Sequence, residues 1–413
     1  MMKQKVINDP VHGFIAVNDP LIYQIIEHPF FQRLKRIKQL GLTDFVYPGA
    51  NHTRFHHALG AYHLMRKALF TLKQKGVKIT EEEERGAQIA ILLHDIGHGP
   101  FSHTLENTLI QDLAHEKISL MFMAKLNAIF NGQLDVAIRI FKNEYPKRFL
   151  YQLVSGQLDV DRLDYLTRDS FFTGVSEGVI NYNRLIDMMD VVDNEMVLEA
   201  KGIYSVEKFL VSRRIMYWQV YLHKTVICAE EMLVKLILRA KHLVNQGVGL
   251  ECSKALMFFI ENEVNQSNFE FDEHTLIRYS NLDDIDILAA VKVWMNHEDK
   301  ILAHLAKCLV NRSLFKIKLQ DNQFEEEEIS AIRNDIIKRF GVSEKDAEYL
   351  LINQEITSYL YNPKHAKIKI LMKGGKVKDF AADKIMKPLM DMLAAAIKKD
   401  PASAEKLEEL QKA

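Results

Sequence analysis

The chain has 413 residues, of which 48% are hydrophobic and 26% charged, and its formal net charge is −1. A chain of this size can bury a large core without disulfides or a structural metal, so a metal site in it would indicate chemistry. The near-neutral charge excludes an overall electrostatic attraction to nucleic acid or to membrane surfaces.

The cysteines and the chain start indicate the compartment. Cys228, Cys252 and Cys308 are far apart and odd in number, so they form no zinc ribbon and favour a reducing environment. The first residues have no apolar run typical of a signal peptide. No stretch reaches the roughly 18 apolar residues that a membrane span requires. We therefore expect a cytoplasmic protein with no membrane contact.

The first fifty residues predict turns, two helices and a loop. The dipeptides Asp9-Pro10 and Asp19-Pro20 mark residues 1–20 as turns and short extended pieces. Apolar spacing becomes helical from Leu21, and Pro29 fits the first turn of a second helix. A loop follows over residues 41–51.

The centre of the chain predicts consecutive helices. The first spans about 55–75. The next has Thr80 as its N-cap and four glutamates at the positive end of the helix dipole, and it is expected to end near Gly97. Periodicity predicts further helices over 112–129, 133–142, 146–155 and 158–168, and a long helical stretch from Val206 to Val244.

The last third predicts helices over 284–311 and 326–360, then the only β structure expected in the chain. Residues 367–372 alternate, Gly374-Gly375 supplies a turn and residues 376–378 return, which favours a hairpin near 367–379. The predicted fold class is all-α and multi-helix, with this small β appendage. We divide the chain into an N-terminal segment 1–50, a catalytic core 51–245 and a C-terminal helical region 246–413.

Histidines are concentrated in one part of the chain. Of 16 histidines, eight lie between residues 52 and 115, at positions 52, 56, 57, 63, 94, 98, 103 and 115. Imidazole is the commonest protein ligand for transition metals, so this clustering is typical of a metal site.

The most informative stretch is Leu92-Leu-His94-Asp95-Ile-Gly97-His98-Gly-Pro-Phe-Ser-His103. His94 and Asp95 follow an apolar helix, and neighbours at a helix terminus can both reach one ion. The glycines allow the backbone to turn closely around the site. We interpret His94 and Asp95 as two adjacent metal ligands.

Two further ligands must come from other segments. The start of the helix at Arg54 offers His56 or His57. On a later helix, Asp161, Asp164 and Arg168 share one face. That face is either a salt-bridged surface, or it directs Asp161 to the metal while Arg162 or Arg168 meets phosphate.

Taken together, these segments resemble the HD-domain phosphohydrolases, within them the deoxynucleotide triphosphohydrolase branch. That branch includes the bacterial dGTPase-like enzymes and a vertebrate enzyme with an added sterile-alpha-motif domain, which is absent here. The resemblance covers roughly residues 5–230. It runs through these blocks: 5–13, 31–41, 47–60, 94–103, 115–116, 161–169 and 213–224.

The resemblance implies a metal-ligand set and a catalytic pocket. The ligands of one divalent metal would be His57, His94, Asp95 and Asp161, with His57 preferred to His56 because it takes the family's position before Ala-Leu-Gly. Mn, Mg, Fe, Zn and Ni are not distinguished by these ligands. Further Mg would arrive with the nucleotide. The catalytic histidines implied are His98, His103 and His115.

The resemblance also implies substrate contacts. The residues expected at the phosphates and the sugar are Gln39, Leu40, Arg54, Arg162, Tyr165, Asp169, Arg213, Tyr221 and Lys224. Arginine and lysine would hold a polyanion that the two ligand aspartates repel. The reaction implied is hydrolysis of a dNTP at its α-phosphate to a deoxynucleoside and triphosphate.

Regulation and assembly follow from the same resemblance. It implies a homo-oligomer, dimer or tetramer, and a regulatory-nucleotide site at Lys5, Val6, Asn8, Glu27, Gln32 and Lys35. Glu27 stands where the vertebrate relative has Asp and Lys35 where it has Arg. A lysine lacks the fork that reads a guanine edge, so the base preference of an activator is left open.

Two other functions are compatible with the sequence. One is a different HD reaction, on a cyclic nucleotide or a nucleotide monophosphate. The other is a non-catalytic module that binds nucleotide or nucleic acid, although the neutral charge does not favour nucleic acid. The basic residues of the expected pocket favour a triphosphate over the first, and the intact ligand set favours catalysis over the second.

Overall fold

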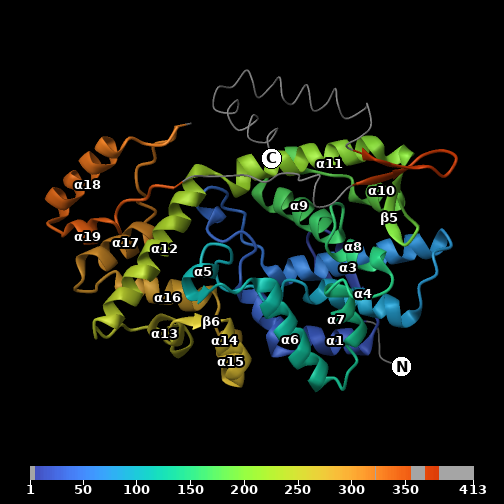
Figure 1. The fold of residues 1–413 in the computed structure, drawn as a ribbon, viewed down its shortest axis with the longest axis horizontal. Helices are drawn as coiled ribbons and strands as arrows, with labels where there is room; N and C mark the ends of the chain where they lie inside the picture. The colour runs from blue at the N-terminus through green and yellow to red at the C-terminus, as the bar shows by residue number, and fades with distance from the viewer. Residues whose placement is uncertain (1–4, 321, 355–367, 381–413) are drawn as a thin grey trace.

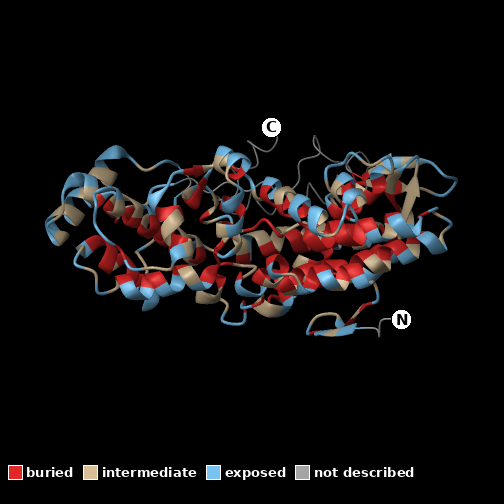
Figure 2. Cartoon of the chain, turned by 90° about the horizontal axis from the view of Figure 1, so that it is seen from below, coloured by how far each residue is buried: buried red, intermediate tan, exposed pale blue. Residues whose placement is uncertain are grey.

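The computed structural model of the chain describes residues 5–320, 322–354 and 368–380. Helices dominate it, and the strands form three small sheets (Figure 1). Figure 2 shows buried residues along the length of the helical body, with exposed residues on its outer faces. The predicted class, all-α with a small β appendage, is therefore confirmed. Among the described residues, no helix is both long and apolar enough to cross a membrane.

The N-terminal elements form a hairpin followed by short helices. Strands β1 and β2 pair antiparallel, with Ile7 opposite Ile15. The bounds of these elements are β1 Lys5–Asp9, β2 Gly13–Val17, α1 Pro20–Glu27, α2 Pro29–Gln32, and the 3-10 turns η1 Arg33–Arg36 and η2 Thr43–Phe45.

The central helices surround α3, whose interior positions are nearly all buried. It packs against α4 and α9. The elements here are α3 Arg54–Gln74, α4 Glu81–Leu93, α5 Glu106–Leu109, β3 Ile110–Gln111, α6 His115–Ile129, α7 Asp135–Phe141, α8 Arg148–Val154, α9 Val160–Thr173, η3 Ser176–Gly178, α10 Tyr182–Asp187, β4 Met189–Val192, β5 Glu195–Glu199, η4 Ala200–Gly202, α11 Ile203–Met216, the π-helix η5 Tyr217–Tyr221 and α12 Lys224–Asn245.

Beyond α12, further short helices pack beside it (Figure 1). Helix α12 contacts both α13 and α17. The remaining elements are α13 Lys254–Glu261, β6 Val264–Asn265, α14 Gln266–Phe271, α15 Glu273–Ser280, α16 Asp284–Trp294, α17 Lys300–Val310, α18 Glu326–Phe340, α19 Glu344–Ala347, β7 Lys369–Leu371 and β8 Val377–Asp379.

The expectation that only the chain end forms β structure is wrong. Besides β1–β2, strand β3 pairs in parallel with β6, and β4–β5 is a hairpin. The predicted terminal hairpin is present as β7–β8, and it joins β4–β5 in a four-stranded sheet of order β4-β5-β7-β8. The pairing of β5 with β7 joins residues about 170 positions apart, which local periodicity cannot reveal.

Several predicted helices are shorter than expected. Helix α4 ends at Leu93, before Gly97. The stretch 206–244 is interrupted after η5, because His223 adopts an extended conformation and its side chain caps α12. The stretch 284–311 is two helices, the second capped by Asp299. In the stretch 326–360, α18 ends where Gly341 turns left-handed at φ 62°. Residues 355–360 of that prediction lie outside the described residues.

Candidate metal centre and active site

His94 and Asp95 lie at the end of α4, as the sequence predicts. His94 caps the helix, and its Nδ1 atom lies 2.6 Å from the carbonyl oxygen of Ile91. Because a carbonyl only accepts, Nδ1 carries the proton and Nε2 is free to bind a cation. The nearer carboxylate oxygen of Asp95 lies 3.3 Å from this Nε2 atom. The two adjacent residues therefore converge on one point.

The structure distinguishes between His56 and His57. The side chain of His56 turns back to Thr53, where its Nδ1 atom accepts the Thr53 N–H at 3.2 Å in a capping box. His57 is fully buried, and its Nε2 atom lies 3.3 Å from Nε2 of His94. Helix capping thus occupies His56 and leaves His57 in the cluster.

Asp161 completes the group from the first turn of α9. Its Oδ1 atom lies 3.1 Å from Nε2 of His57 and 3.4 Å from Nε2 of His94. Ligand atoms that bond one ion at about 2.1 Å are about 3.0–3.4 Å apart, depending on the geometry. The donor atoms of His57, His94 and Asp161 all lie within 4.8 Å of one another, and Asp95 adjoins them. These residues fit a single divalent metal ion.

The surroundings of this cluster are anionic. Burial alone would lower the pKa of His57, but hydrogen bonds to Asp161 and Asp164 outweigh it and raise the pKa to about 10. Burial would likewise raise the pKa of Asp161, but the two histidines bring it well below its usual range. A site that stabilises positive charge so strongly is suited to a cation.

A second layer fixes the orientation of His57. Asp164 is fully buried and accepts from Nδ1 of His57 at 2.8 Å, which directs Nε2 toward the cluster. The same carboxylate contacts Nε2 of His12 at 2.6 Å and accepts from Arg168. Arg168 also pairs with Asp9 at 2.8 Å. The alternative in which Arg168 meets phosphate is therefore wrong, because its guanidinium lies in the interior between two aspartates.

This layer also requires a glycine. A Cβ atom on Gly60 in α3 would lie 2.0 Å from Oδ1 of Asp164 and 2.1 Å from Nη2 of Arg168. Sequence reasoning missed Asp164 and His12 as supports of the site. The helical spacing of Asp161, Asp164 and Arg168 is the signal that identified their shared face, but it could not give the partners.

The three predicted catalytic histidines lie together beside Asp95. The Nε2 atom of His98 is 3.3 Å from Oδ1 of Asp95, and its ring stacks on that of His115 with centroids 3.8 Å apart. His103 packs edge-on against both rings and is largely exposed. Burial, and then the charge of Arg54, hold the pKa of His98 well below its usual value.

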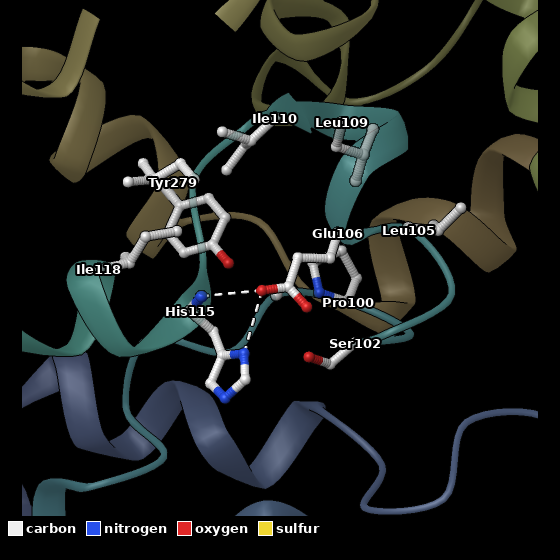
Figure 3. A pocket seen from close by; sticks show the side chains of 11 residues that line it. Pro100, Ser102, Leu105, Glu106, Leu109, Ile110, His115, Ile118 and Tyr279 are labelled. Atoms are coloured by element: carbon white, nitrogen blue, oxygen red, sulfur yellow. Dashed lines mark hydrogen bonds and ion pairs between the residues drawn. The ribbon is translucent and has the colours of Figure 1, made fainter. Parts of the chain in front are cut away.

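Glu106 is a candidate site residue that the sequence analysis missed. It accepts from the backbone N–H of His115 at 2.8 Å and contacts Nδ1 of His115 at 3.0 Å (Figure 3). Burial would raise the pKa of Glu106, but hydrogen bonds with His103 and His115 bring it well below its usual range. His103, Glu106 and His115 also have the spacing of a cation-binding group. The sequence signal for Glu106 was its position three residues after His103, since residues at this spacing can lie side by side.

Basic residues border the same cluster, with unsatisfied donors. Arg54 is buried and donates from Nη1 to Asp95 at 2.6 Å. Arg162 pairs with Asp159, the N-cap of α9, and Arg213 donates to Gln157 at 3.4 Å. Among the described residues, the Nε atoms of all three arginines lack hydrogen-bond partners. Buried donors of this kind are ready to receive an anionic ligand.

The other predicted substrate residues form an aromatic and polar border. The Tyr165 ring is 6.4 Å from that of His57 and 6.3 Å from that of Tyr221. Tyr221 donates to Asp169 at 2.7 Å. Gln39 and Leu40 are half-buried in the segment before the metal cluster, and the Gln39 side-chain oxygen has no partner in the described structure.

Two groups of predicted residues lie at the surface. Lys224 is exposed at the start of α12. Of the regulatory set, Gln32 is half-buried and the others are exposed: Lys5, Val6, Asn8, Glu27 and Lys35. Two of them contact aromatic rings, since Nζ of Lys5 lies over Tyr23 at 5.3 Å and Nζ of Lys35 lies over Phe55 at 4.6 Å.

Comparison with known proteins identifies the family. A model of the HD domain matches residues 54–169, and one of the HD associated region matches residues 180–248. The crystal structure of a phosphohydrolase from Bacteroides thetaiotaomicron is similar, with a TM-score of 0.90 and 51% identity over 92% of this chain and 94% of that one. The chain belongs to the HD-domain phosphohydrolase family. The HD domain contains every residue of the candidate metal cluster.

Similar curated proteins include uncharacterized proteins and deoxynucleoside triphosphate triphosphohydrolases. The uncharacterized protein YwfO of Bacillus subtilis is 33% identical over 92% of this chain and 88% of its own length. The deoxynucleoside triphosphate triphosphohydrolase SAMHD1 of Homo sapiens is 34% identical over 57% of this chain, and its homolog of Dictyostelium discoideum is 35% identical over 60%. The matched part spans 44% of the human protein and 52% of the Dictyostelium protein.

Proposed function

We propose that this HD-domain protein hydrolyses deoxynucleoside triphosphates to a deoxynucleoside and triphosphate. The observation that carries the proposal is that Arg54 donates to Asp95 beside the His57–His94–Asp161 group, and that the buried Nε atoms of Arg54, Arg162 and Arg213 have no hydrogen-bond partner among the described residues. A cation site and positive side chains together suit a polyphosphate. The similarity to SAMHD1 supports this substrate class over other phosphates.

His57, His94, Asp95 and Asp161 would hold one divalent ion. Such an ion, when bound, polarises a phosphate oxygen and lowers the pKa of water. Four protein ligands would leave positions on the ion for water and for a phosphate oxygen of the substrate. Manganese, magnesium, iron, zinc and nickel all suit this donor set, and additional magnesium would accompany the nucleotide.

The reaction requires one proton transfer to the leaving group. Water attacks the α-phosphorus, the bond from that phosphorus to the 5′ oxygen breaks, and the 5′ oxygen takes up a proton. His98, His103 and His115 would line this path as general acids and bases. Glu106 lies at Nδ1 of His115, so the Nε2 atom of that ring would exchange the proton.

The surrounding side chains would bind and orient the nucleotide. Arg54, Arg162, Arg213 and Lys224 supply positive charge for the phosphates. Tyr165 and Gln39, with Leu40 beside it, would border the sugar. Asp169 and Tyr221 are held together by a hydrogen bond of 2.7 Å, which would make a rigid wall where a 2′-hydroxyl is excluded by close packing.

Product analysis tests the proposal. The protein, loaded with Mn²⁺ or Mg²⁺, is incubated with each dNTP alone and with all four, and products are separated by ion exchange. We expect deoxynucleoside and triphosphate, with at least about 1,000-fold less product from Asp161→Ala, because a missing ligand removes the metal-dependent contribution. Asp346→Asn, remote from the cluster, is the matched control. Release of phosphate from a cyclic nucleotide or a nucleotide monophosphate, without dNTP turnover, would contradict it.

We also propose that a nucleotide activator binds at the N-terminal surface between subunits of a homo-oligomer. The supporting observation is that Lys5, Val6 and Asn8 are exposed on β1, close in sequence to Asp9, which pairs with Arg168 in the layer behind the metal cluster. A mixture of dNTPs should then be hydrolysed faster than each dNTP alone, with a larger particle by light scattering. Hyperbolic kinetics unaffected by added nucleotide, in a monomeric protein, would contradict this.

A further inference from the structure

We infer that residues 264–284 act as a clamp on the catalytic loop 97–115, with Tyr279 and Asp284 as its positioning residues. This inference rests on the proposed function, because that loop carries His98, His103 and Glu106. The clamp lies in the C-terminal region, beyond the matched segments 54–169 and 180–248. The inference therefore gives a positioning role to a part of the chain that lies outside those two matched segments.

Tyr279 holds the start of the loop. It is almost fully buried on α15, and its hydroxyl donates to the carbonyl oxygen of Gly97 at 2.9 Å. A Cβ atom on Gly99 would lie 2.6 Å from this hydroxyl, so the loop backbone approaches the tyrosine as closely as a glycine allows. The guanidinium of Arg33 lies over the ring of the same tyrosine, 4.8 Å from the ring centre.

The ring of Tyr279 also faces the pair formed by Glu106 and His115. These three side chains line one small cavity of about 20 Å³ together with apolar residues (Figure 3). A space of this size holds at most about one water molecule, so the wall behind Glu106 is nearly closed. The tyrosine thus limits the movement of the residue that holds His115.

Asp284 connects the loop to the segment around Lys38, which precedes α3 and its proposed ligand His57. Its Oδ1 atom accepts the backbone N–H of Phe101 at 3.0 Å, and its Oδ2 atom accepts that of Lys38 at 2.8 Å. Phe101 has a φ of 45°, a left-handed conformation that is unfavourable for a bulky residue and must be held by its surroundings. Lys38 precedes Gln39 and Leu40, which are proposed to border the sugar.

The far end of the loop is held by backbone pairing. Strand β3 pairs in parallel with β6, with Ile110 opposite Val264 and Gln111 opposite Asn265. The clamp therefore bonds to the loop at two points near its start, Gly97 and Phe101, and pairs with it again toward its end, at residues 110–111. All of these hydrogen bonds end on backbone groups, so loss of one frees the loop without removing a catalytic atom.

The test compares Tyr279→Phe and Asp284→Asn with matched controls. Tyr145→Phe removes a tyrosine hydroxyl bond to Glu83 at 3.1 Å, and Asp299→Asn alters a carboxylate that caps α17 at 2.8 Å. The hydrogen bonds that the described structure gives these two control residues all lie outside the loop. All five proteins are studied as full chains at equal folded fraction, by amide hydrogen exchange, metal content and steady-state kinetics.

We expect peptides covering 96–105 to exchange faster in both clamp variants and to be unchanged in both controls. We also expect kcat to fall at least about tenfold with metal content and KM unchanged, because only the alignment of catalytic groups is lost. The clamp would be overturned if residues 96–105 of the clamp variants exchanged at the wild-type rate. It would also be overturned if their kcat fell no more than that of the controls. If Asp284→Asn does not fold, Tyr279→Phe decides.

Failure of the proposed function has a different signature. In that case the wild-type protein turns over no dNTP, and hydrogen exchange decides whether the clamp exists. Faster exchange of residues 96–105 in the clamp variants alone would support it, and equal exchange in all five proteins would overturn it.

Discussion

At the scale of single residues, Asp164 supports the candidate metal centre without being one of its proposed ligands. Its carboxylate accepts from His57 and from Arg168 in a fully buried setting. Burial would raise its pKa, but Arg168 and the two bonded histidines hold the pKa well below its usual value. Its charge therefore persists in the folded protein and fixes which nitrogen of His57 faces the cluster.

Asp164→Asn should weaken metal binding although every proposed ligand remains. An amide can still contact His57, but it lacks the charge that makes the imidazole a better donor, so we expect about 10- to 100-fold weaker affinity. Titration of the metal-free protein with Mn²⁺ measures this. Asp346→Asn, which loses an ion pair with Arg239 at 2.7 Å, should bind as the wild type does. Equal affinity of the two variants would show that Asp164 has no such role.

Gly60→Ala should destabilise the protein strongly. The added methyl group would overlap the buried pair of Asp164 and Arg168, and such overpacking costs about 1–3 kcal/mol or more in the free energy of unfolding. Gly86→Ala is the matched control, because its methyl would meet the side chain of Val136 at 2.5 Å, which can rotate. Urea denaturation measures both. A smaller loss for Gly60→Ala than for Gly86→Ala would contradict the packing argument.

At the scale of elements, capping determines where the site-bearing helices begin. The Thr80 hydroxyl accepts the Glu83 N–H at 3.2 Å, and the Glu83 carboxylate accepts the Thr80 N–H at 2.9 Å. This box fixes the start of α4, whose opposite end carries His94. The predicted N-cap is confirmed, because Thr-x-x-Glu is a local signal that needs no tertiary information.

Thr80→Ala should lower the free energy of unfolding by about 0.5–2 kcal/mol. The expected loss is confined to stability, since His94 lies about four turns away. Thermal denaturation and steady-state kinetics below the transition separate the two effects. Thr71→Ala, in the interior of α3, serves as a control without a cap. A fall in kcat that exceeds the loss of folded protein would contradict this prediction.

At the scale of the whole molecule, the N-terminal hairpin is bound to the helical body through buried polar contacts. Asp9 pairs with Arg168, and His12 contacts Asp164 and stacks on His63 with centroids 5.3 Å apart. Burial, followed by the nearby His12 and Arg66, lowers the pKa of His63 to about 4. This side chain therefore stays neutral in the folded protein at pH values where the unfolded chain is protonated.

This arrangement predicts acid sensitivity. Between pH 6.5 and about 4 the unfolded chain binds a proton at residue 63 that the folded chain does not, so the free energy of unfolding falls as the pH falls. Above pH 6.5, His63 is neutral in both the folded and the unfolded chain, so it causes no loss of stability there. As the pH falls through this window, the free energy of unfolding of His63→Gln should drop by about 1–2 kcal/mol less than that of the wild type. This figure is smaller than the full pKa shift would give, because the ring is partly exposed to solvent. Urea denaturation at several pH values, with exposed His274→Gln as control, measures it. Parallel curves for wild type and His63→Gln would contradict it.

The sequence by itself determined the helical class, most helix starts and the two adjacent residues His94 and Asp95, because caps and 3.6-residue periodicity are local properties. The resemblance carried by short motifs added His57 and Asp161. Only the tertiary structure showed that His56 caps its helix, that Arg168 is buried with Asp9, and that Glu106 holds His115. It also placed Tyr279 and Asp284 against the loop 97–115. Apart from the local bond between His56 and Thr53, these contacts join residues that are nine to about 180 positions apart. Such distant pairs are selected by packing and burial of the whole chain.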